Sequence, residues 1–219
     1  MGAPAAHAAS ERVDLALVLA VDVSGSVDER RYALQMNGVA DAFEDRADEI
    51  IGGPHGAMLV ALVEWANKPT LSVPWSLLTS REEVRRFAEG VRRTPRAENG
   101  FTCMASALRS IADKLLTRLP VLADRIVVDV SGDGADNCNR ASVDSVRDEL
   151  VATGVTINGL PILEGDEKDT LEAWYRNHVI GGPGAFLVTA MGSGDFERAI
   201  RHKFEGEIAG SATGRFAVR

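Results

Sequence analysis

The hydrophobic residues of this chain fall into two kinds of run that alternate along it. Apolar or alternating runs bounded by turn residues predict strands, and the first of them, 13–21, carries a single charged residue, Asp14. Such a uniformly apolar run is typical of a strand that is buried on both faces of a sheet. Six segments are predicted as strands on this basis: 13–21, 57–65, 70–75, 125–130, 155–163 and 185–190.

Between these strands, apolar residues recur at helical spacing. Tyr32, Met36, Val39 and Phe43 lie on one face of a predicted helix that stops before 52–54, Gly-Gly-Pro. A capping box, Ser80 with Glu83, opens a helix that ends near residue 92. Further helical patterns begin at Thr102 and near Arg140, and cover 166–178 and 195–209.

Strands that alternate with helices form parallel sheets with helices on both faces. The link 67–69 is too short for a parallel crossover, so the segments 57–65 and 70–75 are expected to pair antiparallel at one sheet edge. The presence of Pro74 suits an edge strand. The predicted fold class is therefore α/β, with a doubly wound, mostly parallel six-stranded sheet that has one antiparallel edge strand.

The length of 219 residues corresponds to one domain. We expect this domain over 13–209, between flexible tails at 1–12 and 210–219. The N-terminal stretch lacks the basic and apolar regions of a signal peptide, but Ala6-His7-Ala8 resembles the small-x-small end of one. Two interpretations stay open for it, a flexible tail or the remainder of an export signal.

The composition excludes several classes of function. The formal net charge is −8, and without a basic stretch a nucleic-acid partner is not expected. No apolar run approaches the ~20 residues of a membrane span. The two cysteines, Cys103 and Cys138, form no Cys-x-x-Cys motif, and the four histidines lack zinc-site spacing.

Polar side chains gather where predicted strands end. Asp22, Ser24 and Ser26 form Asp-x-Ser-x-Ser after the first strand, and alternate residues of an extended segment point the same way. Asp133 follows the strand 125–130, and Thr102 stands at a predicted helix start. Doubly wound sheets bind ligands at the carboxyl ends of their strands, so these five side chains are expected to share one crevice. Hard oxygen donors favour Mg²⁺, Mn²⁺ or Ca²⁺ over zinc.

Each of these residues also has an ordinary structural explanation. Ser26 with Glu29 fits a capping box, Thr102 fits the N-cap of its helix, and Asp133-Gly134 is a common turn dipeptide. Together these explanations do not account for the position of every polar turn at the carboxyl end of a strand.

The ordered set resembles the metal-ion-dependent adhesion site of von Willebrand factor A-type domains. The correspondence joins Asp22-x-Ser24-x-Ser26 to its first element, Thr102 to its isolated threonine and Asp133-Gly134 to its final aspartate. The surrounding sequence, over about 13–209, is also similar to a bacterial subgroup of uncharacterised function.

This resemblance implies how a divalent cation would be held. The hydroxyls of Ser24, Ser26 and Thr102 would bind it directly, and Asp22 and Asp133 would hold it mostly through water. We expect one Mg²⁺, with Mn²⁺ or Ca²⁺ as alternatives. Neutral ligands leave much of the ion's charge uncancelled, so an open coordination position would attract a Glu or Asp carboxylate of a protein partner.

The residues around the last aspartate leave alternatives open. Gly132 stands where many members of the family carry threonine or serine. Asp129 shares a strand face with Asp133 and either orients a metal-bound group or is a buried aspartate bonded to backbone amides. Gly134 and Asp136 are expected to support the site, and Asp136 is otherwise an ordinary loop residue.

The two cysteines follow two of the loops in question. Cys138 lies five residues past Asp133, and Cys103 follows Thr102 directly. If both loops surround one metal, as the resemblance implies, a disulfide between them becomes feasible, and it would need an oxidising compartment. The alternative is two free thiols. The expected location is periplasmic or secreted, with a cytoplasmic location as the alternative.

The predicted function is a divalent-cation-dependent protein-binding module without catalysis. One alternative is a phosphate-ester hydrolase-like enzyme with Asp22 as nucleophile, although Ser24 replaces the second acid of the usual Asp-x-Asp motif. Another is a scaffold in which the metal is purely structural. A dinucleotide site is disfavoured because Gly132-x-Gly134 lacks the third glycine of that fingerprint. The sequence predicts neither the partner nor the oligomeric state.

Overall fold

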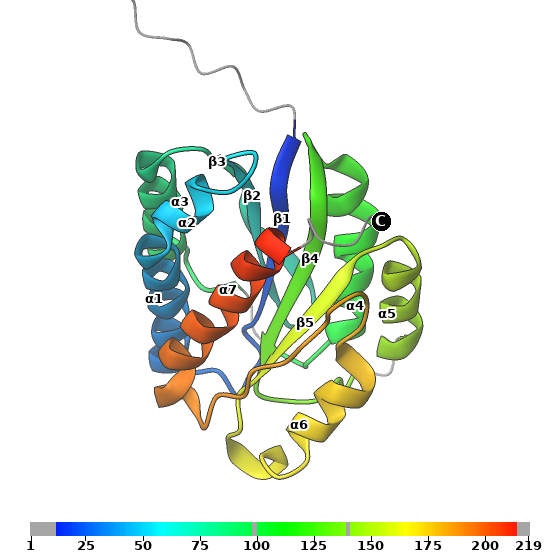
Figure 1. Ribbon diagram of the computed structural model, residues 1–219. Helices are drawn as coiled ribbons and strands as arrows, with labels where there is room; N and C mark the ends of the chain where they lie inside the picture. Colours follow the sequence, from blue (N-terminus) through cyan, green and yellow to red (C-terminus); the bar gives the residue numbers. More distant parts are fainter. Residues whose placement is uncertain (1–11, 98–99, 139–140, 214–219) are drawn as a thin grey trace, which may run out of the picture.

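The computed structural model describes residues 12–97, 100–138 and 141–213. Five strands form one sheet in the order β3-β2-β1-β4-β5 (Figure 1). They are β1 (Arg12–Asp22), β2 (Met58–Trp65), β3 (Pro69–Leu78), β4 (Leu122–Gly132) and β5 (Thr156–Pro161). β1 pairs parallel with β2 and β4, β4 pairs parallel with β5, and β3 lies antiparallel to β2 at one edge. The predicted doubly wound sheet with one antiparallel edge strand is confirmed.

The prediction of a sixth strand over 185–190 is wrong. This segment lies beside β5 but makes only isolated bridges, from Leu187 to Gly159 and from Ala190 to Ile162. A side chain interrupts the ladder, since the amide of Phe186 donates to Oδ1 of Asn158 at 3.1 Å. The side chain of Asn158 in β5 therefore accepts a hydrogen bond that, in a sixth strand, the amide of Phe186 would donate to a backbone carbonyl.

The helices cover both faces of the sheet (Figure 1). On one face lie α1 (Glu29–Asp45), α2 (Ala47–Ile51), α3 (Arg81–Arg93) and α7 (Phe196–Thr213), and on the other lie α4 (Met104–Ser110), α5 (Val143–Ala152) and α6 (Leu171–Trp174). π-helical turns over Ile111–Leu115 and Tyr175–Val179 extend α4 and α6, and 3-10 turns cover Leu116–Arg118, Gly165–Glu167 and Ser193–Asp195.

Side chains of the uniformly apolar β1 pack in two hydrophobic cores, one on each face of the sheet. Leu17 and Leu19 pack in the core beneath α1, α3 and α7, whereas Val18 and Ala20 pack in the core beneath α4, α5 and α6. All four side chains are buried. Because both faces of this strand are covered, no polar residue interrupts its middle, as a central parallel strand requires.

Helix ends agree with the predictions in part. Ser80 caps α3, and its Oγ accepts from the amide of Glu83 at 3.3 Å. The last helix runs past Ala209 to Thr213. The predicted tails, apart from Arg12 and 210–213, fall on residues outside those that the structure describes.

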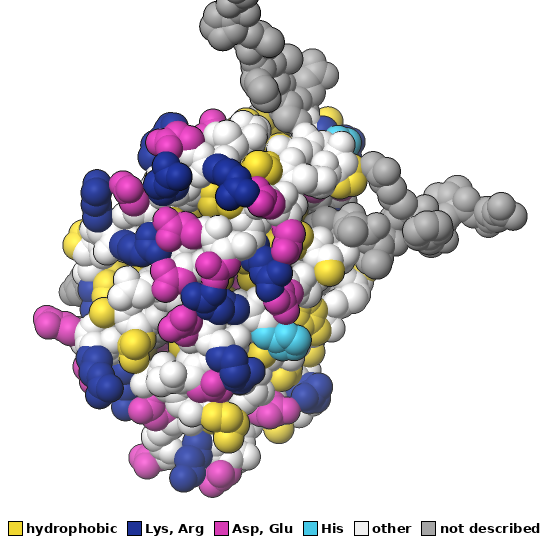
Figure 2. Space-filling model, turned by 60° about the vertical axis from the view of Figure 1, so that its left-hand side comes forward, with side chains coloured by type: hydrophobic (Ala, Val, Ile, Leu, Met, Phe, Trp, Pro, Cys, Tyr) yellow, Lys and Arg dark blue, Asp and Glu magenta, His cyan; other side chains and the backbone are white. Residues whose placement is uncertain are grey.

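On the face shown in Figure 2, acidic and basic side chains are interspersed. Ion pairs join Arg92 to Glu44 at 2.6 Å and Arg201 to Glu197 at 3.0 Å on the helices α1, α3 and α7. Ion pairs near the surface contribute up to about 1 kcal/mol each and are typical of a solvated face. Within the described residues, no helix is both long and apolar enough for a membrane span.

Candidate metal centre

The first element of the candidate site forms where β1 ends. The carboxylate of Asp22 is fully buried, and its Oδ1 accepts from the amide of Ser24 at 2.7 Å. The hydroxyl oxygens of Ser24 and Ser26 lie 3.4 Å apart. The alternation expected for an extended Asp-x-Ser-x-Ser segment thus brings the two hydroxyls together beside the buried carboxylate.

The parallel pairing of β1 with β4 brings the last aspartate to the same edge. Asp133 follows β4 directly, and its Oδ1 accepts from the hydroxyl of Ser26 at 2.6 Å. The capping-box explanation for Ser26 is wrong, because the N-cap of α1 is Asp28, whose side chain accepts from the amide of Arg31. The hydroxyl of Ser26 is therefore available to the site rather than to the helix.

Thr102 is fixed by contacts with the loop that follows β4. Its amide donates to Oδ1 of Asn137 at 2.9 Å, and its carbonyl accepts from the amide of Asn137 at 3.0 Å. The N-cap of α4 is Cys103 rather than Thr102, so the threonine hydroxyl does not cap the helix. Cys103 and Cys138 form a disulfide with a Cα–Cα distance of 5.1 Å, which pins the same two loops together.

The surroundings of Gly132 explain why this position carries glycine rather than threonine or serine. A Cβ atom at this position would lie 2.8 Å from Oδ2 of Asp22 and 2.9 Å from the hydroxyl of Tyr175. Both side chains are fully buried, so neither has room to move aside. The space that a threonine or serine side chain would fill is taken here by the Tyr175 phenol.

Burial changes the acidity of the two site carboxylates. It raises the pKa of Asp22 to about 7, with the negative charge of Asp133 adding to the effect. Burial also raises the pKa of Asp133, against the hydrogen bond from Ser26 and the charge of Arg31. The Oδ2 atom of Asp22 is buried without a hydrogen-bond partner among the described residues. A buried carboxylate without compensation is costly, and a cation in this crevice would supply that compensation.

A cavity of about 230 Å³ opens above these residues. Ser26, Thr102 and Asp133 line it together with the loop from Glu164 to Glu167. Arg31 links Ser26 to this loop, because its guanidinium donates to the carbonyl of Ser26 at 2.5 Å and to the Glu164 carboxylate at 2.9 Å.

The acidic loop was absent from the sequence-based prediction. Its signal was the run Glu164-Gly165-Asp166-Glu167, which comes shortly after the carboxyl end of β5, at the same edge of the sheet. Tyr175 was also missed, because an apolar pattern marks it as a core residue and only its hydroxyl reaches the site.

The three supporting residues have different surroundings. Asp129 forms a buried ion pair with Lys203 of α7. The alternative prediction, that backbone amides bind its carboxylate, is therefore wrong. Asp136 accepts from the amides of Ala105 at 3.0 Å and Cys138 at 3.2 Å, and so holds the loop around Thr102. Gly134 lines the cavity.

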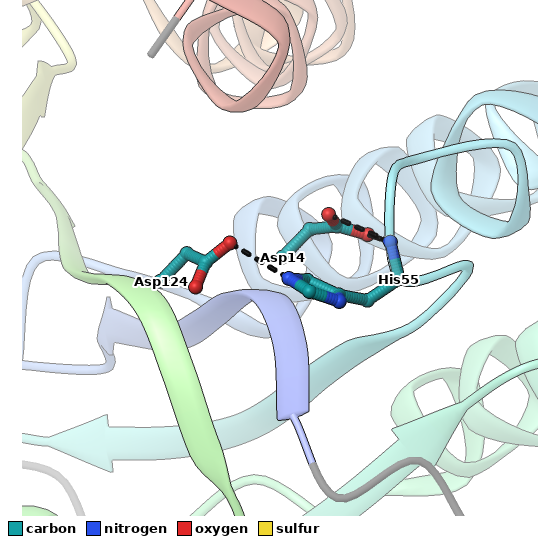
Figure 3. A group of neighbouring side chains, drawn as sticks. All are labelled: Asp14, His55 and Asp124. Atoms are coloured by element: carbon teal, nitrogen blue, oxygen red, sulfur yellow. Dashed lines mark hydrogen bonds and ion pairs between the residues drawn. The ribbon is translucent and has the colours of Figure 1, made fainter. Parts of the chain in front are cut away.

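A second group of metal-ligand type lies at the opposite end of the sheet (Figure 3). Asp14, His55 and Asp124 each offer one ligand atom, and these atoms lie within 4.8 Å of one another. Asp14 accepts from the backbone amide of His55 at 3.1 Å, and Asp124 pairs with the His55 ring at 2.9 Å and with Arg12 at 2.6 Å. At ~3.3 Å per strand residue, the eight steps from Asp14 to Asp22 span about 26 Å. The carboxylates of this second group already have partners, Asp124 in ion pairs and Asp14 in hydrogen bonds from the His55 amide.

The first centre offers only oxygen donors. Three hydroxyls and two carboxylates converge from three loops, with one carboxylate oxygen left without a partner among the described residues. This donor set fits a hard divalent cation such as Mg²⁺ or Mn²⁺.

Solved structures with this fold include adhesion and matrix proteins. Proximal thread matrix protein 1 from the mussel byssus superposes with a TM-score of 0.66 at 18% identity over 89% of this chain and 46% of that one. A second structure of that protein, with a zinc-occupied MIDAS motif, gives a TM-score of 0.63 at 20% identity over 90% and 46% of the two chains. The pilus adhesin SpaC from Lactobacillus rhamnosus GG gives 0.65 at 14% identity, over 90% of this chain and 30% of that one.

A von Willebrand factor type A protein from Catenulispora acidiphila gives a TM-score of 0.61 at 16% identity, over 91% of this chain and 43% of that one. The chain thus spans less than half the length of these structural neighbours. No curated protein matches the sequence. A family model described as a protein of unknown function, DUF1194, matches residues 12–212. The chain therefore belongs to the DUF1194 family, and its fold is that of von Willebrand factor A domains.

Proposed function

We propose that this protein is a divalent-cation-dependent protein-interaction module. The observation that carries the proposal is the convergence of Asp22, Ser24, Ser26, Thr102 and Asp133 at one edge of the sheet. The ordinary roles expected for Ser26 and Thr102 as helix caps are absent, so their hydroxyls remain available to a ligand.

The cation would be held by the hydroxyls of Ser24, Ser26 and Thr102, with Asp22 and Asp133 acting mostly through water. Once bound, it supplies a concentrated positive charge in a crevice that otherwise holds two carboxylates. Mg²⁺ is the ion proposed, with Mn²⁺ and Ca²⁺ as alternatives. The mussel neighbour that carries zinc in its MIDAS motif supports metal binding on this fold.

The proposed partner is a protein that offers a Glu or Asp carboxylate to the cation. Three neutral hydroxyl ligands leave the ion with charge to attract that acid. The printed names of the neighbours, a pilus adhesin and a thread matrix protein, support an interaction role on this fold. A nucleophilic role for Asp22 is disfavoured, because its carboxylate is fully buried and out of reach of a substrate.

The proposed location is periplasmic or extracellular. The support is the disulfide between Cys103 and Cys138, because disulfides persist in oxidising compartments. The adhesin among the structural neighbours agrees with that environment.

Calorimetric titration of the metal-stripped protein tests the proposal. Mg²⁺ or Mn²⁺ is expected to bind the wild type at one ion per chain, and Asp133→Asn is expected to weaken binding at least tenfold. Asp124→Asn is the matched control, since it makes the same chemical change in the second acidic group, and it should bind as the wild type does. Loss of binding in Asp124→Asn but not in Asp133→Asn would place the cation at the wrong end of the sheet and refute the proposal.

A further inference from the structure

The acidic loop between β5 and α6 places a carboxylate of this chain over the candidate centre. The Oε2 atom of Glu167 accepts from the amide of Ala135 at 2.8 Å, two residues after Asp133. Gly165 adopts a positive φ of 69°, which a glycine reaches without strain, and the loop turns there. Glu167 is exposed, so its position does not result from core packing.

The space beside Gly134 lies next to both this carboxylate and the Thr102 hydroxyl. The point at which a Cβ of Gly134 would stand lies 3.8 Å from Oε2 of Glu167 and 3.7 Å from Oγ1 of Thr102. Glu167 also lines the same cavity as Ser26, Thr102 and Asp133. A carboxylate of the loop thus lines the same small cavity as three of the five proposed metal-binding residues.

The charges in this loop are compensated unequally. Glu164 is neutralised by Arg31 at 2.9 Å, which anchors the loop to the start of α1. The Glu167 carboxylate has a backbone amide as its partner and, among the described residues, forms no ion pair with a basic side chain. A cation at the centre would attract this carboxylate more strongly than a neutral amide does.

We propose that Glu167 fills the open coordination position of the cation while no partner is bound, so that a partner's carboxylate has to displace it. This inference rests on the proposed metal centre. The carboxylate of Glu167 and the carboxylate of the partner would then compete for the same coordination position of the cation. Interaction then requires a partner acid that binds the ion better than Glu167 does.

The number of water molecules bound to Mn²⁺ tests this inference. Water-proton relaxation of the Mn²⁺-loaded protein reports the waters in direct contact with the ion. Glu167→Gln is expected to add about one such water and to raise the relaxivity accordingly. Asp166→Asn is the matched control, because Asp166 is exposed, lines the same cavity and carries the same charge. It should leave the water count unchanged.

The outcomes separate this inference from the proposed function. If the wild type and Glu167→Gln bind Mn²⁺ with the same water count, Glu167 is not a ligand, and the metal centre itself stands. If Asp166→Asn raises the count as much as Glu167→Gln does, the effect is one of local charge, and the inference also fails. If the wild type binds no Mn²⁺, the proposed function fails together with it.

Discussion

Replacing Lys203 with Met is expected to lower the free energy of unfolding by about 3–5 kcal/mol, because it removes the basic partner of the buried Asp129 carboxylate. The ammonium group of Lys203 is fully buried and pairs with Asp129 and, at 2.8 Å, with Glu207. Asn158 donates to the same Glu207 oxygen at 3.1 Å. These contacts connect α7 to β4 and β5, so the loss should appear in urea unfolding as a lower midpoint.

Two control variants make this result specific. Lys114→Met removes an exposed lysine and is expected to change stability by about 0.5 kcal/mol or less. Adding Asp129→Asn to Lys203→Met removes one of the uncompensated charges and should recover part of the loss. A loss below about 1 kcal/mol in Lys203→Met would show that the network does not stabilise the fold.

Replacing Asp22 with Asn is expected to abolish cation binding and yet to stabilise the metal-free protein. The Asp22 carboxylate is fully buried, and its Oδ2 atom has no hydrogen-bond partner among the described residues. An ionised carboxylate in that position costs free energy that a neutral amide of the same size does not. In the presence of a chelator at pH 7.5, the variant should be more stable than the wild type by roughly 1–4 kcal/mol.

The raised pKa of Asp22 also predicts the direction in which the stability of the metal-free protein changes with pH. Burial raises the pKa of Asp22 from 3.8 to about 7, so the folded protein holds a proton there that the unfolded chain has lost. The stability of the metal-free wild type should therefore fall as the pH rises from about 4 to 7. Because Asp129 also has a raised pKa, the difference between the wild type and Asp22→Asn isolates the share of Asp22. Equal pH profiles for the two proteins would contradict this account.

The strand pattern was sufficient to predict the central strand and the antiparallel edge of the sheet. Uniformly apolar residues in 13–21 predicted a central strand, and the short link at 67–69 predicted the antiparallel edge, both of which the structure has. The segment 185–190 has the composition of a strand, but the side chain of Asn158 takes the amide of Phe186. A hydrogen bond from a backbone amide to a distant side chain depends on tertiary contacts, so a local hydrophobic pattern does not predict it.

The candidate site was predictable where its residues follow strands. Asp22 ends β1 and Asp133 directly follows β4, and parallel pairing brings such positions together without further information. Asp129 differs, because its partner Lys203 lies on a helix 74 positions further along the chain. Tyr175 could not be foreseen either, since the space it fills exists only because Gly132 lacks a side chain.

The position of Mn²⁺ in crystals of the protein, located by its anomalous scattering, tests the central claim most directly. We expect one peak at the carboxyl edge of the sheet, within about 2.0–2.6 Å of the hydroxyls of Ser24, Ser26 and Thr102. A peak between Asp14, His55 and Asp124, with none at the carboxyl edge, would contradict this claim.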